Sequence, residues 1–162
     1  MTRSPFKDTL QLSARAATAA GLSVTIARLA ARPYPIYALV AAVIVTDLSA
    51  EQTRKLGLPR LAGTLVGAAL GAVLSPWLGG SAWGIGLGIF AAMMATHLLS
   101  LPQTARVSGF VCGIVLLIHS DHPWFYAGHR LVETILGIGV AVLVSLVPHL
   151  LRYEDPPRRE GA

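Results

Sequence analysis

The chain has 162 residues, of which 54% are hydrophobic and 13% are charged, and its mean hydropathy is +0.62. Soluble domains carry about a quarter charged residues, so this composition excludes an ordinary soluble domain and indicates a one-domain integral membrane protein. The formal net charge is +5, but the basic residues lie in short segments between apolar runs. This distribution favours membrane topology over nucleic-acid binding. The single cysteine, Cys112, excludes an intrachain disulfide.

Six apolar runs follow one another along the chain, and each predicts a helix. The predicted helices span about residues 12–31, 36–50, 61–78, 83–99, 107–118 and 130–151. Residues 1–11 form a predicted cytoplasmic N-terminal segment, and residues 152–162 form a charged cytoplasmic tail. A bilayer span needs about 20 residues, so the second and fifth helices are short. The first run is also compatible with a signal peptide, an alternative that the internal repeat disfavours.

The basic residues predict the orientation of these helices through the positive-inside rule. Ten of the thirteen Lys and Arg residues lie on one side if both termini are cytoplasmic: Arg3, Lys7, Arg15, Arg54, Lys55, Arg60, Arg106, Arg152, Arg158 and Arg159. Trp77, Trp83 and Trp124 then lie near the opposite interface, where aromatic side chains are favoured. We therefore expect a multi-pass protein of the inner (plasma) membrane with six spans.

An octapeptide occurs twice, as RLAGTLVG at 60–67 and as RLVETILG at 130–137. A Thr-Asp pair at 46–47 precedes the first copy, and a Ser-Asp pair at 120–121 precedes the second. Pro33 and Pro102 likewise precede the two short helices. Helices one to three thus correspond to helices four to six, and a repeat of three spans must invert its orientation in the membrane. The predicted fold is all-α, with two inverted three-helix repeats.

Short apolar segments at corresponding positions of two inverted repeats are a sequence sign of a transport site. Thr64 and Thr134 follow Arg60 and Arg130 by four residues, so each Arg–Thr pair shares a helix face. A guanidinium binds a carboxylate through two hydrogen bonds, and two arginines near opposite surfaces would attract an organic anion. The alternatives are arginines that snorkel to lipid headgroups and threonines that bond their own backbone.

Glu133 takes the place in the second copy that Gly63 has in the first. Because it lies three residues after Arg130, it can form an intrahelical ion pair. Alternatively it couples transport to protons, since intramembrane carboxylates commonly mark proton relays. Asp47 is the second candidate for proton coupling, or equally the polar end of its helix.

Gly63, Gly67 and Gly71 recur every four residues, and Gly137 belongs to a smaller glycine pair on the sixth helix. Close helix packing is the favoured interpretation, and a smooth path along the bare helix face is the alternative. The same face offers a contact between subunits. We therefore expect a homo-oligomer, most simply a dimer with its two-fold axis along the membrane normal.

Other functional classes have little support in the sequence. His119, Asp121 and His122 form a weak metal-ligand pattern that a water-facing loop explains better. The chain has no Ser–His–Asp arrangement, no paired-aspartate lipid-phosphate motif and no Gly-rich nucleotide loop. The sequence therefore predicts a protein that is not an enzyme, with no metal and no cofactor.

Three segments resemble the fusaric acid resistance and aromatic acid exporter family of membrane transporters, which is itself similar to the plant malate-channel group. They are PYPIYALVAAVIVTDLS at 33–49, RLAGTLVGAALGAVL at 60–74 and RLVETILGIGVAVLVSLVP at 130–148. The resemblance implies export of aromatic or other organic acids, driven by the proton gradient in many members. Larger relatives carry two such blocks or long cytosolic domains, which this chain does not have.

The residues and the resemblance together predict an exporter of small organic anions, with aromatic carboxylic acids as substrates and the lipid bilayer as its surroundings. An anion channel and a non-transporting assembly partner are the alternative functions.

Overall fold

The computed structural model describes residues 5–118 and 122–147, and within these ranges it is helical without strands. The helices are α1 (Pro5–Leu29), α2 (Pro35–Val45), α3 (Ala50–Leu78), α4 (Ala82–Leu98), α5 (Ala105–Ile118) and α6 (Pro123–Leu146). A short 3₁₀ turn, η1 (Pro102–Thr104), leads into α5. The predicted all-α class is confirmed.

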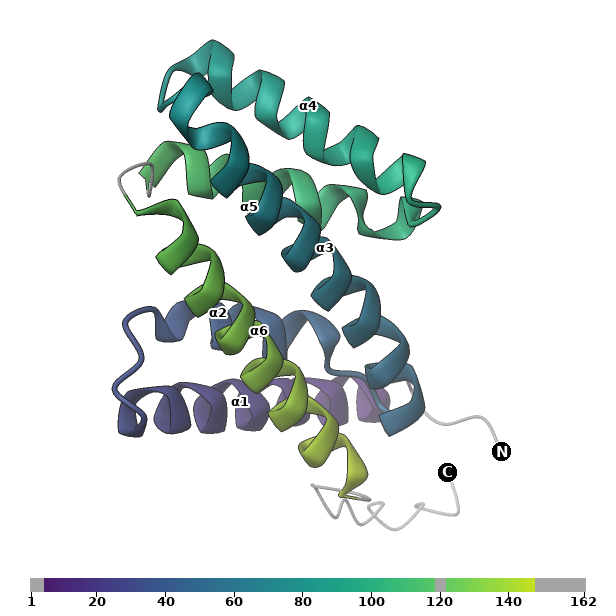
Figure 1. The fold of residues 1–162 in the computed structure, drawn as a ribbon. Coiled ribbons are helices and arrows are strands. Elements are labelled where there is room, and N and C mark those ends of the chain that lie inside the picture. The colour runs from purple at the N-terminus through teal and green to yellow at the C-terminus, as the bar shows by residue number, and fades with distance from the viewer. Residues whose placement is uncertain (1–4, 119–121, 148–162) are drawn as a thin grey trace, which may run out of the picture.

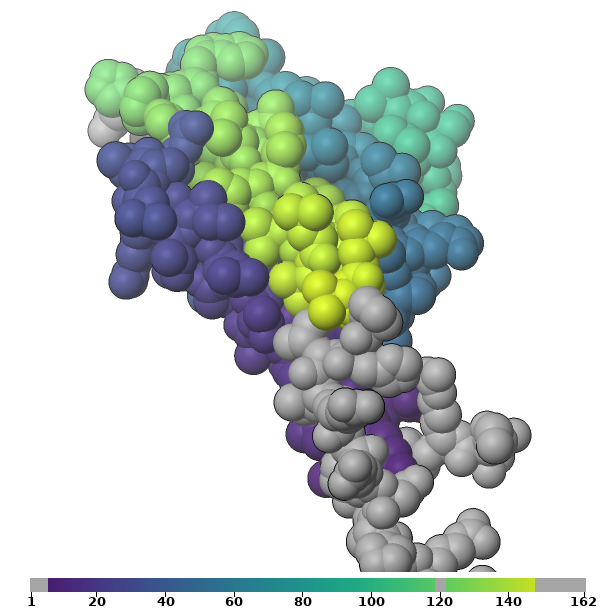
Figure 2. All heavy atoms as spheres, turned by 90° about the horizontal axis from the view of Figure 1, so that it is seen from below, coloured from purple at the N-terminus to yellow at the C-terminus, as the bar shows by residue number. Residues whose placement is uncertain are grey.

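The six helices form two outer pairs and one central pair. α1 and α2 lie together at the bottom of Figure 1, α4 and α5 lie together at the top, and α3 and α6 run diagonally between them. The α1–α2 and α3–α4 connections lie at the left, whereas the α2–α3 and α4–α5 connections lie at the right. Seen from below, α6 lies between α1 and α3 (Figure 2). Successive helices therefore run back and forth between the same two ends.

The two halves of the chain pack in corresponding ways. α1 packs against α2 as α4 packs against α5, and α2 packs against α6 as α5 packs against α3. α1 also packs against α6 as α4 packs against α3, and the central helices α3 and α6 contact each other. Each half therefore places its short helix against the long central helix of the other half.

The connection after α1 has the same backbone form as the connection after α4. Ala31 has a φ of 48° and Ser100 has a φ of 59°, the left-handed conformation that ends many helices. The N–H of the next residue, Arg32 or Leu101, then donates to a carbonyl five residues earlier, at 2.9 and 2.8 Å. A proline follows directly in both cases and prevents the helix from continuing. The two prolines therefore mark equivalent turns.

α3 begins at Ala50 rather than at residue 61, so the predicted charged loop is the first part of the helix. Ser49 caps the helix, because its side chain accepts a hydrogen bond from the Gln52 N–H at 3.1 Å. Glu51 and Lys55 form an exposed ion pair one turn apart, at 2.7 Å. Pro59 lies inside the helix. The Ser-x-x-Gln pattern at 49–52 is a recognised start signal for a helix.

The other helix bounds differ less from the prediction than the start of α3 does. α6 begins at Pro123 rather than at residue 130, with proline in the first turn, where its missing N–H costs nothing. α1 begins at Pro5 rather than at residue 12, and α2 ends at Val45 rather than at residue 50. With eleven residues α2 is about 16 Å long, which is well below the bilayer core of about 30 Å.

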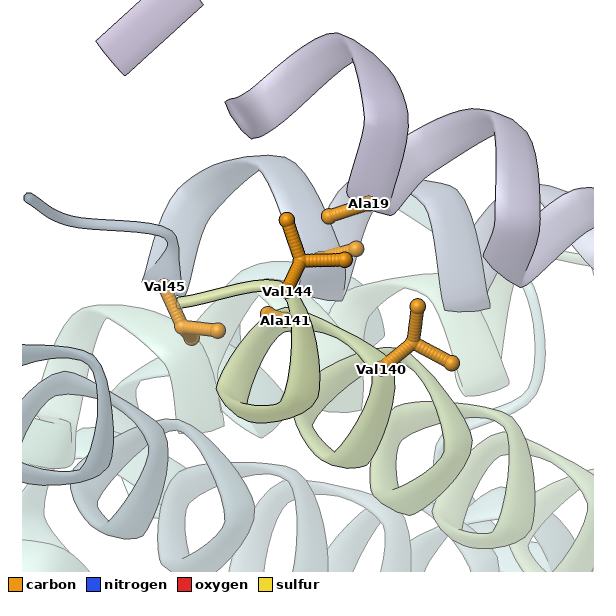
Figure 3. Packing of buried hydrophobic residues seen from close by; sticks show 6 residues of the cluster. Ala19, Val45, Val140, Ala141 and Val144 are labelled. Carbon is orange, nitrogen blue, oxygen red and sulfur yellow. The ribbon is translucent and has the colours of Figure 1, made fainter. Parts of the chain in front are cut away.

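The interior is built from small side chains and the outside from large apolar ones. Where α1, α2 and α6 meet, the core consists of alanine and valine: Ala19, Ala42, Val45, Val140, Ala141 and Val144 (Figure 3). In contrast, Trp83 is 88% exposed and Phe90 is 65% exposed. Soluble proteins rarely expose so much large apolar surface, whereas helices in lipid associate through small residues.

Two of the described helices, α3 and α6, are long and apolar enough to cross a membrane by length and composition. Together with the apolar exterior, they indicate a membrane protein.

Arg15 joins three helices at one end of the molecule. Its guanidinium donates to the carbonyls of Asp47 and Leu48, which follow α2, and to the carbonyl of Val147, which follows α6. Carbonyls at helix C-termini carry partial negative charge, so a cation there stabilises both helix ends. Arg15 is therefore a buried structural residue rather than a surface charge that only sets topology.

Candidate functional site

The long helices α3 and α6 cross in opposite directions. A Cβ at Gly57, early in α3, would lie 2.8 Å from Ile138, late in α6. Ala68, later in α3, shares a core cluster with Ala127, early in α6. The two candidate arginines lie between these contacts on their respective helices. They are therefore part of the crossing.

Arg60 and Arg130 are buried, with exposed fractions of 7% and 1%. Each lies only about 6 Å along its helix from the helix midpoint, because both helices begin earlier than predicted. Their positive charges are close enough to repel each other. The expectation that they lie near opposite membrane surfaces is therefore wrong. Neither side chain is exposed at the protein surface, as snorkelling to headgroups requires.

Aromatic rings surround the guanidinium of Arg130. Its central carbon lies 3.6 Å from the centroid of the Tyr37 ring and 5.5 Å from that of Phe110, both within cation–π range. Tyr34, Tyr37 and Tyr126 pack against one another, with ring centroids 5.5 to 5.9 Å apart. The site thus combines a fixed positive charge with three clustered tyrosines.

Several nitrogen atoms of the two arginines have no hydrogen-bond partner within the described residues. These atoms are Nε and Nη1 of Arg130 and Nε of Arg60. A guanidinium keeps its charge in a protein, and a buried polar group without a partner is unfavourable. The arrangement therefore offers hydrogen-bond donors to an anion.

Glu133 is fully buried but does not form the ion pair with Arg130 that its spacing allowed; no such contact occurs in the described ranges. Its Oε1 accepts a hydrogen bond from the Tyr34 N–H at 3.0 Å, while Oε2 has no partner among the described residues. The charges of Arg130 and Arg32 both act on the carboxylate. Because Tyr34 is the residue before α2, Glu133 lies at the N-terminal end of that short helix.

The two threonines use their hydroxyl hydrogens within the helices. Thr64 donates to the carbonyl of Arg60 at 2.9 Å, and Thr134 donates to the carbonyl of Arg130 at 2.8 Å. The structure thus agrees with the alternative in which each threonine bonds the backbone of its own helix. It leaves neither threonine with a free donor for an anionic substrate.

The glycine face of α3 lies against α5. A Cβ added at Gly63, Gly67 or Gly71 would come closer than 3.0 Å to atoms of α5 or the turn before it. On α6, a Cβ at Gly137 would collide with the Ala38 carbonyl of α2. The face on α3 is therefore covered inside the molecule, so it is neither an open path nor a surface that a second subunit could contact.

Asp47 lies just beyond α2, at the opposite end of this helix from Glu133. Its carboxylate accepts a hydrogen bond from the Leu48 N–H at 2.7 Å, and its own N–H donates to the Thr53 hydroxyl at 3.0 Å. Eleven helical residues separate the two ends by about 16 Å. The structure therefore does not bring the two proton-coupling candidates together.

A shallow pocket of about 340 Å³ opens beside α6, lined by Arg32, Trp124, Phe125, Gly128, His129 and Val132. Within residues 5–118 and 122–147, no three His, Cys, Asp or Glu side chains are grouped as a metal site would require. His119 and Asp121 lie outside the described residues.

The sequence reasoning missed the aromatic part of the site. Tyr34 and Tyr37 are in the PYPIY segment before and within α2, and Tyr126 is in the first turn of α6. Two tyrosines beside the prolines of a short helix were an available signal. Their contact with Arg130 depends on how α2 packs against α6, which no local pattern reveals.

Residues 21–144 match the fusaric acid resistance protein-like family. No curated protein and no solved structure matches the chain. The family match covers more than half of the chain and includes α2, α3, α4, α5 and both arginines of the crossing. The chain therefore belongs to the fusaric acid resistance protein-like family.

Proposed function

We propose that the chain exports small organic anions, with aromatic carboxylates as the substrate class. Membership of the family supports a function in membrane transport or resistance. The observation that carries the substrate class is the buried Arg130, whose Nε and Nη1 have no partner in the described part of the chain and whose guanidinium lies over Tyr37. A carboxylate matches this guanidinium with two hydrogen bonds, and an aromatic ring packs well on the tyrosine cluster.

The charge balance of the site supports the same substrate class. Among the described residues, the crossing buries Arg60 and Arg130 but only one carboxylate, Glu133. A buried charge without a partner is strongly unfavourable, so one additional negative charge would neutralise the crossing. A monovalent organic anion supplies that charge. Glu133 is the proposed proton-coupling residue, because it is a buried carboxylate beside the anion site.

The proposed arrangement in the membrane has six spans and two inverted three-helix repeats. Gly67 packs on the backbone of Ser108, and Gly137 packs on the backbone of Ala38. The paired glycines are 70 residues apart in the sequence, as are their two contacts. These matched contacts support a two-fold relation between the halves, with the short helices α2 and α5 ending within the bilayer and the arginines near its middle.

Cysteine labelling tests this topology in the inner membrane. In a Cys112→Ala background, Gly80→Cys in the α3–α4 turn should react with a membrane-impermeant thiol reagent added outside the cell. Lys55→Cys, at the other end of α3, should react only after the membrane is permeabilised, because it faces the cytoplasm. Labelling in the reverse pattern would place both termini outside and contradict the proposed orientation.

Flux measurements in proteoliposomes test the function itself. We expect saturable uptake of labelled benzoate above the level of protein-free liposomes, with benzoate competing better than cyclohexanecarboxylate, which has the same charge but no aromatic ring. Flux no greater than that of empty liposomes would reject transport and favour an assembly partner. Flux that never exceeds equilibrium under an imposed proton gradient would favour an anion channel.

A homo-oligomer remains part of the proposal, most simply a dimer. Six helices, of which α2 and α5 are short, enclose little interior, and a second copy would add helix–helix packing within the lipid. Native mass spectrometry of the full chain in nanodiscs should give twice the protomer mass. A monomer in both mild detergent and nanodiscs would contradict it.

A further inference from the structure

The carboxylate of Glu133 lies where a bound anion would be stabilised. It accepts a hydrogen bond from the N–H of Tyr34, the residue that precedes the first turn of α2. N–H groups at a helix start lack partners within the helix and carry partial positive charge, so they bind anions. The Tyr34 side chain does not cap α2. Glu133 is therefore the group that caps this helix, from a different part of the chain.

Arg130 lies at the same end of α2. Its guanidinium stacks on Tyr37, in the first turn of the helix, and is 1% exposed with Nε and Nη1 unpartnered in the described residues. The Glu133 carboxylate interacts electrostatically with the charge of Arg130, but the two side chains form no ion pair in the described residues. The donors of Arg130 and the helix start thus form one anion site, of which Glu133 uses only the helix start.

The other half of the molecule has no such group. Gly63 holds the position that corresponds to Glu133, and a Cβ there would lie 2.8 Å from the Thr104 carbonyl that precedes α5. That half therefore has no room for a carboxylate. A structural need of the repeated fold does not explain Glu133, because the equivalent connection forms without it.

We propose that Glu133 is a tethered competitor of the transported anion. When ionised, its carboxylate occupies the start of α2 and repels a second negative charge from Arg130. When protonated, it loses its charge and releases the helix start, so that the substrate anion binds the Tyr34 N–H and the Arg130 guanidinium together. Binding of the anion is thus linked to binding of one proton at Glu133, and this inference rests on the proposed function.

Three arginines and one histidine are the other charged or titratable groups to consider around Glu133. Arg130 on α6 and Arg32 in the α1–α2 connection both act on the carboxylate. Arg60 of α3 interacts with Arg130. His129 lies one helical turn before Glu133, so its replacement provides a separate control.

Equilibrium binding of labelled p-toluenesulfonate to the purified chain in nanodiscs tests the proposal. This probe is a strong acid whose charge is constant, so any pH dependence between about pH 5 and about pH 8 belongs to the protein. The dissociation constant of the unmodified chain should rise by up to about tenfold per pH unit once Glu133 ionises. For Glu133→Gln it should remain low across the range. His129→Gln should retain the pH dependence of the unmodified chain.

Proton uptake gives a second measurement. In weak buffer near neutral pH, sulfonate binding should take up a proton in the unmodified chain and in His129→Gln but not in Glu133→Gln, since binding of the anion and of the proton are linked. If sulfonate binding to the unmodified chain does not depend on pH, the competitor role of Glu133 is wrong. The same conclusion follows if binding to Glu133→Gln still depends on pH. Neither result contradicts the proposed transport function. If the unmodified chain binds no sulfonate and no benzoate at any pH, the proposed function itself fails.

Discussion

Arg130→Gln is expected to abolish saturable flux of aromatic carboxylates while the protein still inserts and purifies as a single species. The variant removes the two unpartnered donors, Nε and Nη1, that we assign to the substrate. A hydrogen bond to a charged group contributes about 1.5 to 3 kcal/mol, so the loss of each donor should weaken substrate binding roughly ten- to a hundredfold. Flux and equilibrium binding in the same proteoliposome preparation measure this change.

The stability of the variant separates a substrate site from a structural site. An unpaired buried charge destabilises a protein, so Arg130→Gln should leave the melting temperature unchanged or raise it. Arg130→Lys should restore flux only in part, because an ammonium keeps the charge but loses the bidentate geometry and the planar stacking on Tyr37. Loss of flux together with a large loss of stability would instead make Arg130 a structural residue.

Two further arginines on α3 provide the comparison. Arg60 is buried with Nε unpartnered in the described chain, so Arg60→Gln should also reduce flux. The reduction should be smaller, because the aromatic rings found in the described residues lie around Arg130. Arg54 is exposed on the first turns of the same helix, and Arg54→Gln should transport normally. If both buried arginines can be replaced without any effect on flux, the assigned site is wrong.

The general plan of the fold was predictable from the sequence because it depends on local patterns. The apolar runs predicted six helices, and Pro33 and Pro102 marked the turns before α2 and α5. The repeated octapeptide predicted corresponding halves, and the helix packing pairs correspond in the same way. Composition alone indicated the membrane, because so few residues are charged.

The starts of α3 and α6 differ from the prediction because charged and polar residues, which are typical of loops, form the first turns of both helices. Ser49 and Gln52 form a start signal at the beginning of the charged segment, and Pro123 is a suitable first-turn residue of α6. Missing these signals placed the arginines near the helix ends. With the observed starts, both lie well inside their helices and close to the crossing.

The partners of individual side chains could not be predicted from spacing. The distance of three residues between Arg130 and Glu133 allows an ion pair, yet α2 packs against α6 and offers both residues other contacts. The guanidinium of Arg130 stacks on the Tyr37 ring, and the carboxylate of Glu133 accepts a hydrogen bond from the Tyr34 N–H. Such a competition between helix-internal and tertiary partners depends on the packed arrangement, because each alternative is compatible with the sequence.

The close approach of α2 to α6 depends on Gly137, and its replacement should damage the site from a distance. A Cβ at this position would collide with the Ala38 carbonyl and lie 2.9 Å from the Ala41 side chain. Backbone cannot give way as a flexible side chain can, so α2 itself must shift. Overpacking of this kind costs about 1 to 3 kcal/mol. The shift would also displace Tyr34, which precedes α2, and Tyr37, which lies in α2. Both tyrosines belong to the site.

Gly139 on the same helix provides the matched control for this prediction. A Cβ there would meet nothing within 4 Å, so Gly139→Ala should be neutral or slightly stabilising, because alanine favours the helix. Gly137→Ala should lower both the melting temperature in detergent and the flux of benzoate in proteoliposomes. Two glycines separated by one residue would then differ sharply in their tolerance of the same methyl group. If the two variants are equally stable and equally active, α2 does not approach α6 as closely as the contact at Ala38 requires, and the anion site at the start of α2 loses its geometric basis.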